Sequence, residues 1–210
     1  MDGDDGLDDL RLRIAACRIC RDQPARGPAF RLPHEPRPVA VLSRKARILI
    51  AGQAPGLRVH RSGLPFDDAS GDRLRDWLGV DRATFYDRDR FAVAAMGFCF
   101  PGYDAKGGDL PPRRECAPAW RPAVMAAMPS VDLVLAIGRH AQLWHLGARA
   151  EKTVAATVRR FGDYCRVNAP PMVMPLPHPS WRNTAWLRAN PWFAEDLLPL
   201  LKSLVKDRIA

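Results

Sequence analysis

The chain has 210 residues, 47% of them hydrophobic, which is long enough for one domain with a sizeable core. Its apolar runs fall far short of the ~20 residues that a membrane-spanning helix needs. The acidic start MDGDDGLDDL lacks the positive charge of a secretory signal peptide. We therefore expect neither a membrane-spanning helix nor a signal sequence. We expect a cytoplasmic protein with one domain, residues 1–210. We also expect a monomer, and no pattern predicts a protein partner.

The charge is strongly basic. The chain has 32 Lys and Arg residues against 23 Asp and Glu residues, a net charge of +9. Arginine predominates, and its planar guanidinium group matches phosphate geometry better than an ammonium group does. A polyanionic partner would explain this excess. Arginine-rich codon usage in a GC-rich genome, with the charges on a solvated surface, would explain it as well.

The N-terminal region divides into three parts. Residues 1–6 are expected to form a disordered acidic tip. The apolar residues that follow recur at helical spacing and predict a short amphipathic helix ending at CRIC. Residues 21–44 are rich in Pro and Arg without a clear period, which predicts an extended arm lying over the domain. The helix-spaced residues are Leu7, Leu10, Ile14 and Cys17.

Four apolar runs predict the strands of a sheet. Helical stretches alternate with them, so we predict an α/β fold, a three-layer α/β/α sandwich around a mostly parallel sheet of about four strands. Ligands in such folds bind beyond the carboxyl ends of the strands. The four runs are ARILIAG (Ala46 to Gly52), RFAVAAMGF (90–98), VDLVLAIG (Val131 to Gly138) and PPMVMPLPHPS (170–180).

Two of the predicted helices have signals at their ends. Ser70 is expected to cap the first, and Gly79 lies where that helix should end. The second lies near the C-terminus, where Pro191 and Pro199 are expected to break or reset it. The core-facing residues of the two helices would be Leu74, Trp77, Leu78, Trp186, Leu187, Phe193, Leu197, Leu200 and Leu204.

The turn GQAPG follows the first predicted strand. Gly52 and Gly56 let the backbone approach a ligand closely, and Pro55 stiffens the turn between them. An ordinary strand-to-helix turn would have the same composition. A second unusual turn, PHPSWRN, follows the fourth predicted strand and is expected at the same edge of the sheet.

Four segments, taken in order, resemble the uracil-DNA glycosylase superfamily, and especially its iron-sulfur, family-4-like branch. They are GQAPG, SGLPF, VLAIGRHA and PHPSWRN, and the resemblance covers roughly Cys17 to Asn183. It implies a monofunctional DNA glycosylase of base excision repair. The enzyme would hydrolyse the N-glycosidic bond of uracil in DNA, with other deaminated bases as further candidates, after the base is flipped into a pocket.

The resemblance also implies roles for individual residues. Phe66 would stack on the flipped base, while the backbone of Gln53 and Ala54 touches its edge. His178 would donate a hydrogen bond to the carbonyl oxygen that gains charge, and Ser180 would hold a neighbouring phosphate. Alternatively, Phe66 is a core residue and His178 is structural. The full set expected to bind substrate is Gly52, Ala54, Pro55, Gly56, Phe66, Ser180 and Asn183.

A DNA-facing rim is predicted around these loops. Arg58 and Arg61 follow the first motif, and Arg113 and Arg114 lie before Cys116, so both groups are expected along one edge. Trp181 and Arg182 would supply a wedge for the base stack and a phosphate clamp, or else a surface anchor for the last helix. His60 could line the mouth of the pocket, although an exposed loop position is the simpler interpretation. The residues predicted to contact DNA are Arg58, Arg61, Trp181 and Arg182.

The first motif departs from the family in its catalytic positions. Gln53 and Ala54 stand where related enzymes carry Glu, Asp or Asn, and neither can act as a general base. Ala95 occupies the place of a base-reading Asn. Gln53 could position water while His178 stabilises the leaving base, which makes these two residues catalytic candidates. Asp68, or its neighbour Asp67, could instead supply the carboxylate, or the pair could simply favour a helix N-terminus.

The cysteines suggest a metal centre. In a reducing cytosol, five cysteines are more readily thiols or metal ligands than disulfides. The resemblance implies that four of them hold a 4Fe-4S cluster. Zinc would satisfy four thiolates equally well, and buried thiols are a third option. Cys165 has no partner in this scheme and is expected in the core. The four predicted ligands are Cys17, Cys20, Cys99 and Cys116.

Two other classes of protein remain open. One is a non-catalytic, metal-stapled nucleic-acid-binding protein that keeps the scaffold but has lost the water-activating carboxylate. The other is a small redox protein that uses the cluster for electron transfer, although the basic surface and both pocket motifs speak against it.

Overall fold

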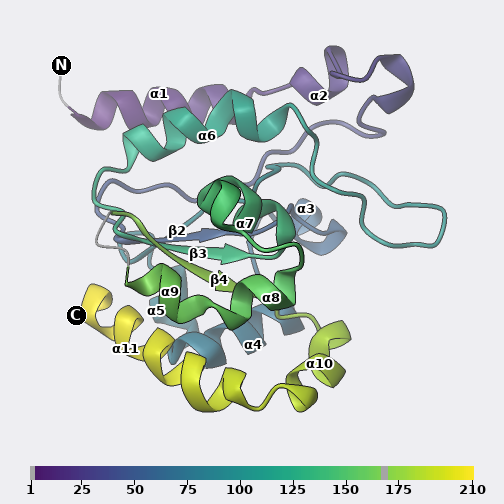
Figure 1. The fold of residues 1–210 in the computed structure, drawn as a ribbon. Helices are drawn as coiled ribbons and strands as arrows, with labels where there is room; N and C mark the ends of the chain where they lie inside the picture. The colour runs from purple at the N-terminus through teal and green to yellow at the C-terminus, as the bar shows by residue number, and fades with distance from the viewer. Residues whose placement is uncertain (1–2, 167–169) are drawn as a thin grey trace.

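The computed structural model describes residues 3–166 and 170–210. Four strands form a single sheet in the order β2-β1-β3-β4, and each pairing is parallel (Figure 1). Helices cover both faces, so the predicted three-layer α/β/α sandwich is confirmed. The strands are β1 Ile48–Ala51, β2 Phe91–Val93, β3 Leu133–Ile137 and β4 Met172–Leu176.

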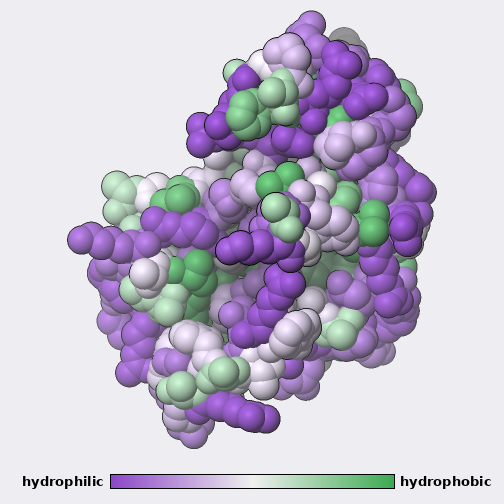
Figure 2. Space-filling model, turned by 90° about the vertical axis from the view of Figure 1, so that its right-hand side faces the viewer, coloured by the Kyte–Doolittle hydropathy of each residue, from purple (hydrophilic) through white to green (hydrophobic). Residues whose placement is uncertain are grey.

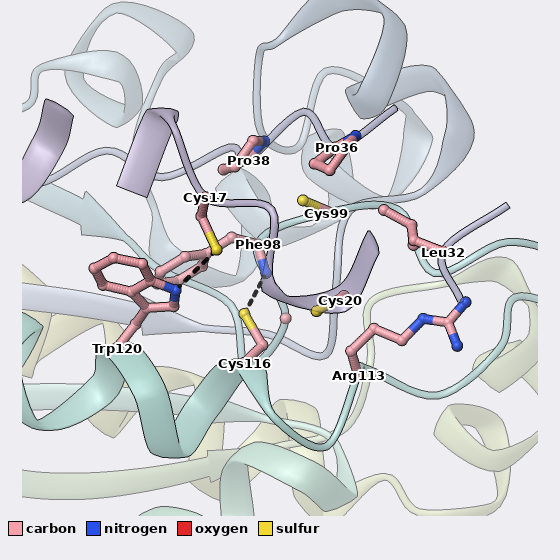
Figure 3. A pocket seen from close by; sticks show the side chains of 11 residues that line it. Cys17, Cys20, Leu32, Pro36, Pro38, Phe98, Cys99, Arg113, Cys116 and Trp120 are labelled. Atoms are coloured by element: carbon pink, nitrogen blue, oxygen red, sulfur yellow. Dashed lines mark hydrogen bonds between the residues drawn. The ribbon is translucent and has the colours of Figure 1, made fainter. Parts of the chain in front are cut away.

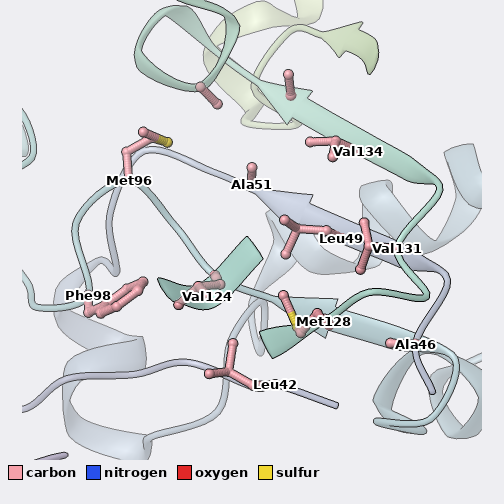
Figure 4. Packing of buried hydrophobic residues seen from close by; sticks show 14 of the residues in the cluster. Leu42, Ala46, Leu49, Ala51, Met96, Phe98, Val124, Met128, Val131 and Val134 are labelled. Carbon is pink, nitrogen blue, oxygen red and sulfur yellow. The ribbon is translucent and has the colours of Figure 1, made fainter. Parts of the chain in front are cut away.

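The core lies on both faces of the sheet. Along β1, Ile48 and Ile50 pack toward one helical layer, whereas Leu49 and Ala51 pack toward the other. Figure 4 shows the hydrophobic cluster on the face of Leu49 and Ala51, where Leu49 packs near side chains of helix α6. Because successive residues alternate between two buried faces, the strands are apolar throughout. The layer over Leu49 contains α1 Gly3–Ala15, α6 Cys116–Ala127 and α7 Arg139–Leu146, and the opposite layer contains α4 Ala69–Leu78, α5 Arg82–Tyr86, α8 Val154–Arg159 and α11 Leu198–Ile209.

The strand order creates a switch point at the carboxyl ends of β1 and β3. From β1 the chain moves to β2 on one side, and it then returns to β3 on the other side of β1. In open parallel sheets, such a point is the usual ligand site. The strands point toward the side of the molecule that carries α3 Leu57–Ser62 and α10 Thr184–Ala189 (Figure 1). Figure 2 looks onto that side, which is hollowed and largely hydrophilic with scattered apolar side chains.

The N-terminal region differs from the prediction at its start. Helix α1 begins at Gly3, so positions 3–6 of the expected disordered tip are helical, and residues 1–2 lie outside the described residues. The buried side chains of Leu7, Leu10 and Ile14 hold this helix against the domain. Packing of one face of α1 against the domain also stabilises its first turn, which the helix propensity of residues 3–6 alone would not predict.

The arm that follows α1 contains α2 Ile19–Asp22 and the short 3-10 helix η1 Pro28–Phe30, and is otherwise irregular. Its buried Leu32 and Leu42 anchor it to the domain. Val41 forms an isolated antiparallel bridge with Val93 of β2. The arm therefore lies across the domain and contacts the edge strand of the sheet.

Helix α4 is capped by Asp68 rather than by Ser70, and it ends at Gly79 as predicted, with a φ of 69°. Pro191 separates α10 from the π-helical segment η4 Phe193–Leu197, and Pro199 lies in the first turn of α11. No helix in residues 3–166 and 170–210 is both long and apolar enough to cross a membrane. The remaining short elements are η2 Gly147–Arg149, α9 Phe161–Cys165 and η3 Trp181–Asn183.

Candidate active site at the carboxyl ends of the strands

The GQAPG turn directly follows β1 and is joined to the segment after β2. The carbonyl oxygen of Gly52 accepts a hydrogen bond from the backbone N–H of Met96, and that of Gln53 accepts one from Gly97, both at 2.9 Å. A Cβ placed on Gly52 would lie 3.8 Å from Cζ of Phe66. The ring of Phe66 therefore lies beside the bare backbone of the first motif.

Phe66 is held in an unusual conformation. Its φ of 56° is the only positive φ at a non-glycine residue in the described part of the chain. Its carbonyl oxygen accepts a hydrogen bond from Nη1 of the buried Arg75 at 3.3 Å, and that oxygen would lie 1.7 Å from a Cβ on Gly71. The ring meets Phe85 edge-on, with 6.1 Å between centroids. Left-handed backbone at such a residue costs ~1–3 kcal/mol and is concentrated at functional sites.

Gln53 lies against the loop between Cys99 and Cys116, and Ala54 lies beside Gly97, which precedes that loop. Nε2 of Gln53 lies 3.5 Å from the carbonyl oxygen of Leu110, a weak hydrogen bond. Cβ of Ala54 lies 3.5 Å from the position that a Cβ on Gly97 would take. Neither side chain is titratable, so these two positions of the first motif offer no general base.

The HPSWRN turn follows β4 and is braced from within. Nδ2 of Asn183 donates to the carbonyl oxygen of His178 at 2.7 Å. Oγ of Ser180 accepts from the backbone N–H of Arg182 at 3.1 Å and caps η3. Arg73, on α4, donates to the carbonyl oxygen of Ser180 at 2.9 Å. Ser180 and Asn183 therefore shape this loop, and α4 ties it to the segment that carries Phe66.

Charged side chains from several segments affect the pKa of His178. Its side chain remains open to solvent, yet enough protein surrounds it to lower its pKa. Burial is the main cause, Asp68 and Asp109 act in the opposite direction, and Arg182 lowers the pKa further. At neutral pH the ring is thus neutral and carries one N–H, which suits it to donate to an oxygen that gains negative charge.

The two aspartates that follow Phe66 have different environments. Oδ1 of Asp68 accepts a hydrogen bond from the backbone N–H of Gly71 at 2.9 Å and so caps α4. The charge of Asp68 also raises the pKa of His178. Asp67 instead accepts a hydrogen bond from Arg82 at 2.9 Å, which holds its pKa below the ordinary value. Of the pair, only Asp68 belongs to the surroundings of His178.

Asp109 joins the site although the sequence pattern did not mark it. A Cβ placed on Gly56 would lie 3.7 Å from Oδ2 of Asp109, so this carboxylate lies beside the first motif. Burial raises its pKa, while Arg182 and His178 lower it, so the same carboxylate is within electrostatic reach of the second motif. Its loop has no periodic pattern, and its position depends on the antiparallel bridge between Tyr103 and Asp109 and on hydrogen bonds within the same hairpin.

A basic rim flanks these loops. Arg58 and Arg61 of α3 are exposed and line a shallow groove with Tyr103, which is itself 51% exposed. On the second motif, Trp181 is 75% exposed, and the guanidinium carbon of Arg182 lies 5.9 Å from its ring centroid. The four residues predicted to contact DNA are therefore accessible from solvent.

Arg113, which was expected at the rim, is turned inward, and His60 does not have the exposed loop position predicted for it. Arg113 donates to the carbonyl oxygens of Phe30 and Pro101 at 3.0 and 3.1 Å, so it braces the arm and the cysteine loop instead of facing DNA. His60 lies on α3, half-buried, with its ring centroid 4.5 Å from that of His34. These contacts depend on residues distant in sequence, which local patterns do not reveal.

The cysteines gather at one pocket on the N-terminal side of the domain (Figure 3). The indole N–H of Trp120 and the backbone N–H of Phe98 donate to the sulfurs of Cys17 and Cys116, each at 3.3 Å. Apolar side chains, including Leu32, form part of the wall. The four predicted ligands, Cys17, Cys20, Cys99 and Cys116, all line this pocket.

The four thiols form no disulfide, and Cys165 is likewise free. Burial raises the pKa of Cys20, Cys99 and Cys116 to about 12, so a bound cation would have to displace their protons. Among the described residues, no three His, Cys, Asp or Glu side chains are drawn together closely enough to hold a single metal ion. Four cysteines are the donor type that holds an iron-sulfur cluster.

Arg121 of α6 connects the cysteine region with the site and was also missed. The guanidinium group is 1% exposed and donates to the carbonyl oxygens of Ala94 and Ala95 at 2.7 and 2.9 Å. Burial lowers its pKa to about 10. Its position in the sequence resembles that of any polar residue on a helix, so its burial could not be read from the pattern.

The fold and this site define an α/β protein that carries two motif loops at the carboxyl ends of its parallel strands, beside exposed arginines. A model described as "Uracil DNA glycosylase superfamily" matches residues 39–202. The chain belongs to this superfamily, and membership supports a DNA-glycosylase-like function and DNA as the substrate. The matched segment includes both motifs and the cysteines Cys99 and Cys116, whereas Cys17 and Cys20 precede it.

Proposed function

We propose that the protein is a monofunctional DNA glycosylase of the iron-sulfur, family-4-like branch, which releases uracil from DNA and leaves an abasic site. Other deaminated bases are further candidate substrates. The proposal is supported by the superfamily match and by α4, whose Arg73 holds the loop of His178 and whose Arg75 holds Phe66 in its positive-φ conformation.

The chemistry explains why these two residues suffice for much of the rate. As the N-glycosidic bond breaks, the sugar gains positive charge and the departing base gains negative charge. The N–H of His178 would stabilise the base by donating to its carbonyl oxygen. Phe66 would stack on the flipped base, against the bare backbone of Gly52. Gln53 would position the base edge and water, since its side chain is held only weakly by Leu110.

The rim would supply DNA affinity without sequence choice. Arg58, Arg61 and Arg182 are exposed cations around the site, and phosphate contacts of this kind are independent of base identity. The exposed indole of Trp181 would enter the space left in the base stack. Ser180 and Asn183 would keep the loop in the shape that holds a flanking phosphate.

We further propose that the four cysteines hold a 4Fe-4S cluster with a mainly structural role. The supporting observation is one pocket shared by Cys17 and Cys20 of the N-terminal segment with Cys99 and Cys116 of the wide loop. A cluster there would pin the N-terminal segment and the loop that carries Asp109 to the domain. Reduced thiolates of this kind suit a cytoplasmic enzyme. Zinc is the alternative occupant.

The test is an excision assay. Single- and double-stranded oligonucleotides that contain one uracil are incubated with the purified protein and then treated with alkali, which cleaves abasic sites. We expect cleavage at the uracil and none in a thymine control. The variant His178→Ala should excise ~10²-fold more slowly or worse, as for the loss of an oxyanion donor.

Two controls make the excision test decisive. Thermal unfolding of His178→Ala must match the parent, so that a slow rate reflects chemistry. A parent protein that binds these oligonucleotides but never cleaves them would instead be the non-catalytic binding protein. A His178→Ala variant with the parental rate would refute the role assigned to the imidazole.

A further inference from the structure

A carboxylate is missing from the first motif, and two candidates face His178 in its place. Asp68 and Asp109 both act on the imidazole, from α4 and from the cysteine loop respectively. The two differ in what already binds them. Asp68 is engaged as the N-cap of α4 through Oδ1, whereas no hydrogen bond or ion pair within residues 3–166 and 170–210 engages the side chain of Asp109.

The hairpin that carries Asp109 is well fixed. Oδ1 of Asp104 accepts the backbone N–H groups of Lys106 and Gly108, both at 2.8 Å, and closes the turn. The backbone N–H of Leu110 donates to Gly102 at 2.9 Å. A carboxylate at the base of this hairpin is therefore presented by a rigid element, as a catalytic group requires.

The position of Asp109 joins both motifs. Oδ2 lies 3.7 Å from the place of a Cβ on Gly56, so the carboxylate lies within contact distance of the first motif. The charged groups that face Asp109 are His178 and Arg182 of the second motif. Since the flipped nucleotide is expected between the two motifs, a carboxylate here would face the sugar and the attacking water.

We propose that Asp109 is the general base of this enzyme and replaces the carboxylate that GQAPG lacks. The inference rests on the proposed glycosylase function. In the step it assists, the bond between C1′ and the base nitrogen breaks, and its electron pair leaves with the base. A water oxygen bonds to C1′, and the proton of that water passes to the Asp109 carboxylate and then to solvent. His178 meanwhile donates its hydrogen bond to the departing base.

The test compares single-turnover rates of uracil excision in the full-length protein. Asp109→Asn should be slower by at least ~10²-fold, the usual contribution of a general base. Asp207→Asn, on the exposed end of α11, removes the same charge far from the site and should keep the parental rate. In Asp109→Gly, added formate should restore part of the rate, because a small carboxylate can occupy the vacated space.

A pH series separates catalysis from structure. Burial raises the pKa of Asp109, so the carboxylate becomes protonated, and inactive as a base, sooner as the pH falls. The ratio of the parental rate to the Asp109→Asn rate should therefore approach one toward acidic pH. Because Asp109 raises the pKa of His178, Asp109→Asn also moves the titration of the imidazole to lower pH, and following that titration by NMR in both proteins separates this shift from the loss of the base.

Each outcome decides the matter. Parental rates in Asp109→Asn, or a loss confined to Asp68→Asn, would overturn the assignment. A slow Asp109→Asn variant with a constant ratio across pH, and no response of the glycine variant to formate, would show a structural role only and would overturn it too. If the parent itself excises no uracil, the proposed function fails and the inference fails with it. Melting temperatures of all variants establish that they fold.

Discussion

Replacing Gly71 by alanine tests the strained conformation of Phe66. The new Cβ would lie 1.7 Å from the carbonyl oxygen of Phe66 and 2.6 Å from its carbonyl carbon. The two segments must move apart by more than about 1 Å to reach a tolerable contact. Either Phe66 leaves its φ of 56° or the first turn of α4 shifts away from its Asp68 cap.

The expected cost follows from these contacts. Overpacking of this kind costs about 1–3 kcal/mol, and a disturbed N-cap adds about 1 kcal/mol. We expect Gly71→Ala to lose about 2–4 kcal/mol in its free energy of unfolding. For a chain of 210 residues, this corresponds to a melting temperature lower by roughly 5–15 °C. Uracil excision should slow as well, because the ring of Phe66 would move from its place beside Gly52.

Gly162→Ala is the matched control. Gly162 lies within α9, and no atom lies within 4 Å of its Cβ position. Alanine there should raise the free energy of unfolding by roughly 0.5–1 kcal/mol. Thermal unfolding followed by circular dichroism measures both variants. If Gly71→Ala melted at the parental temperature and kept the parental excision rate, the reasoning about Phe66 would be wrong.

Two further predictions concern the rim and the metal centre. Replacing Arg58 and Arg61 together by alanine should flatten the slope of log affinity for DNA against log salt concentration by roughly 1–2. Replacing Arg88 and Arg90, at the opposite end of the strands, should leave the slope unchanged. If a salt titration gave the parental slope for the first variant, Arg58 and Arg61 would not belong to the DNA interface. The purified protein should be brown and contain iron and inorganic sulfide in equal amounts. Cys116→Ser should lose the iron and the sulfide, whereas Cys165→Ser, on α9, should keep them. A colourless parent protein with bound zinc would contradict the cluster.

Much of the fold could be predicted because its elements are locally defined. Strand β1 is buried on both faces, so Ile48 to Ala51 form an uninterrupted apolar run that can be recognised from the sequence alone. Gly79 marks the end of α4 because a left-handed C-cap favours glycine. The start of α4 was less certain, since Asp68 and Ser70 are both good caps and only the three-dimensional turn selects between them.

The site was predictable only where a motif carried it. His178 follows β4 after a single proline, whereas Phe66 lies beyond α3 and was marked only by the SGLPF motif. Asp109 belongs to an irregular loop, and its approach to Gly56 depends on the closure of a hairpin and on long-range packing. Arg121 is buried because it donates hydrogen bonds to carbonyl oxygens just after β2, and the local sequence pattern does not indicate such a long-range contact.

The most direct test of the central claim is the structure of the protein bound to DNA that contains an uncleavable deoxyuridine analogue. The measured quantity is the distance from the imidazole nitrogens of His178 to the carbonyl oxygens of the base. We predict one such distance of about 3 Å, with the base flipped out and stacked on Phe66. A base that remains in the duplex, or one bound with His178 turned away from it, would contradict the claim.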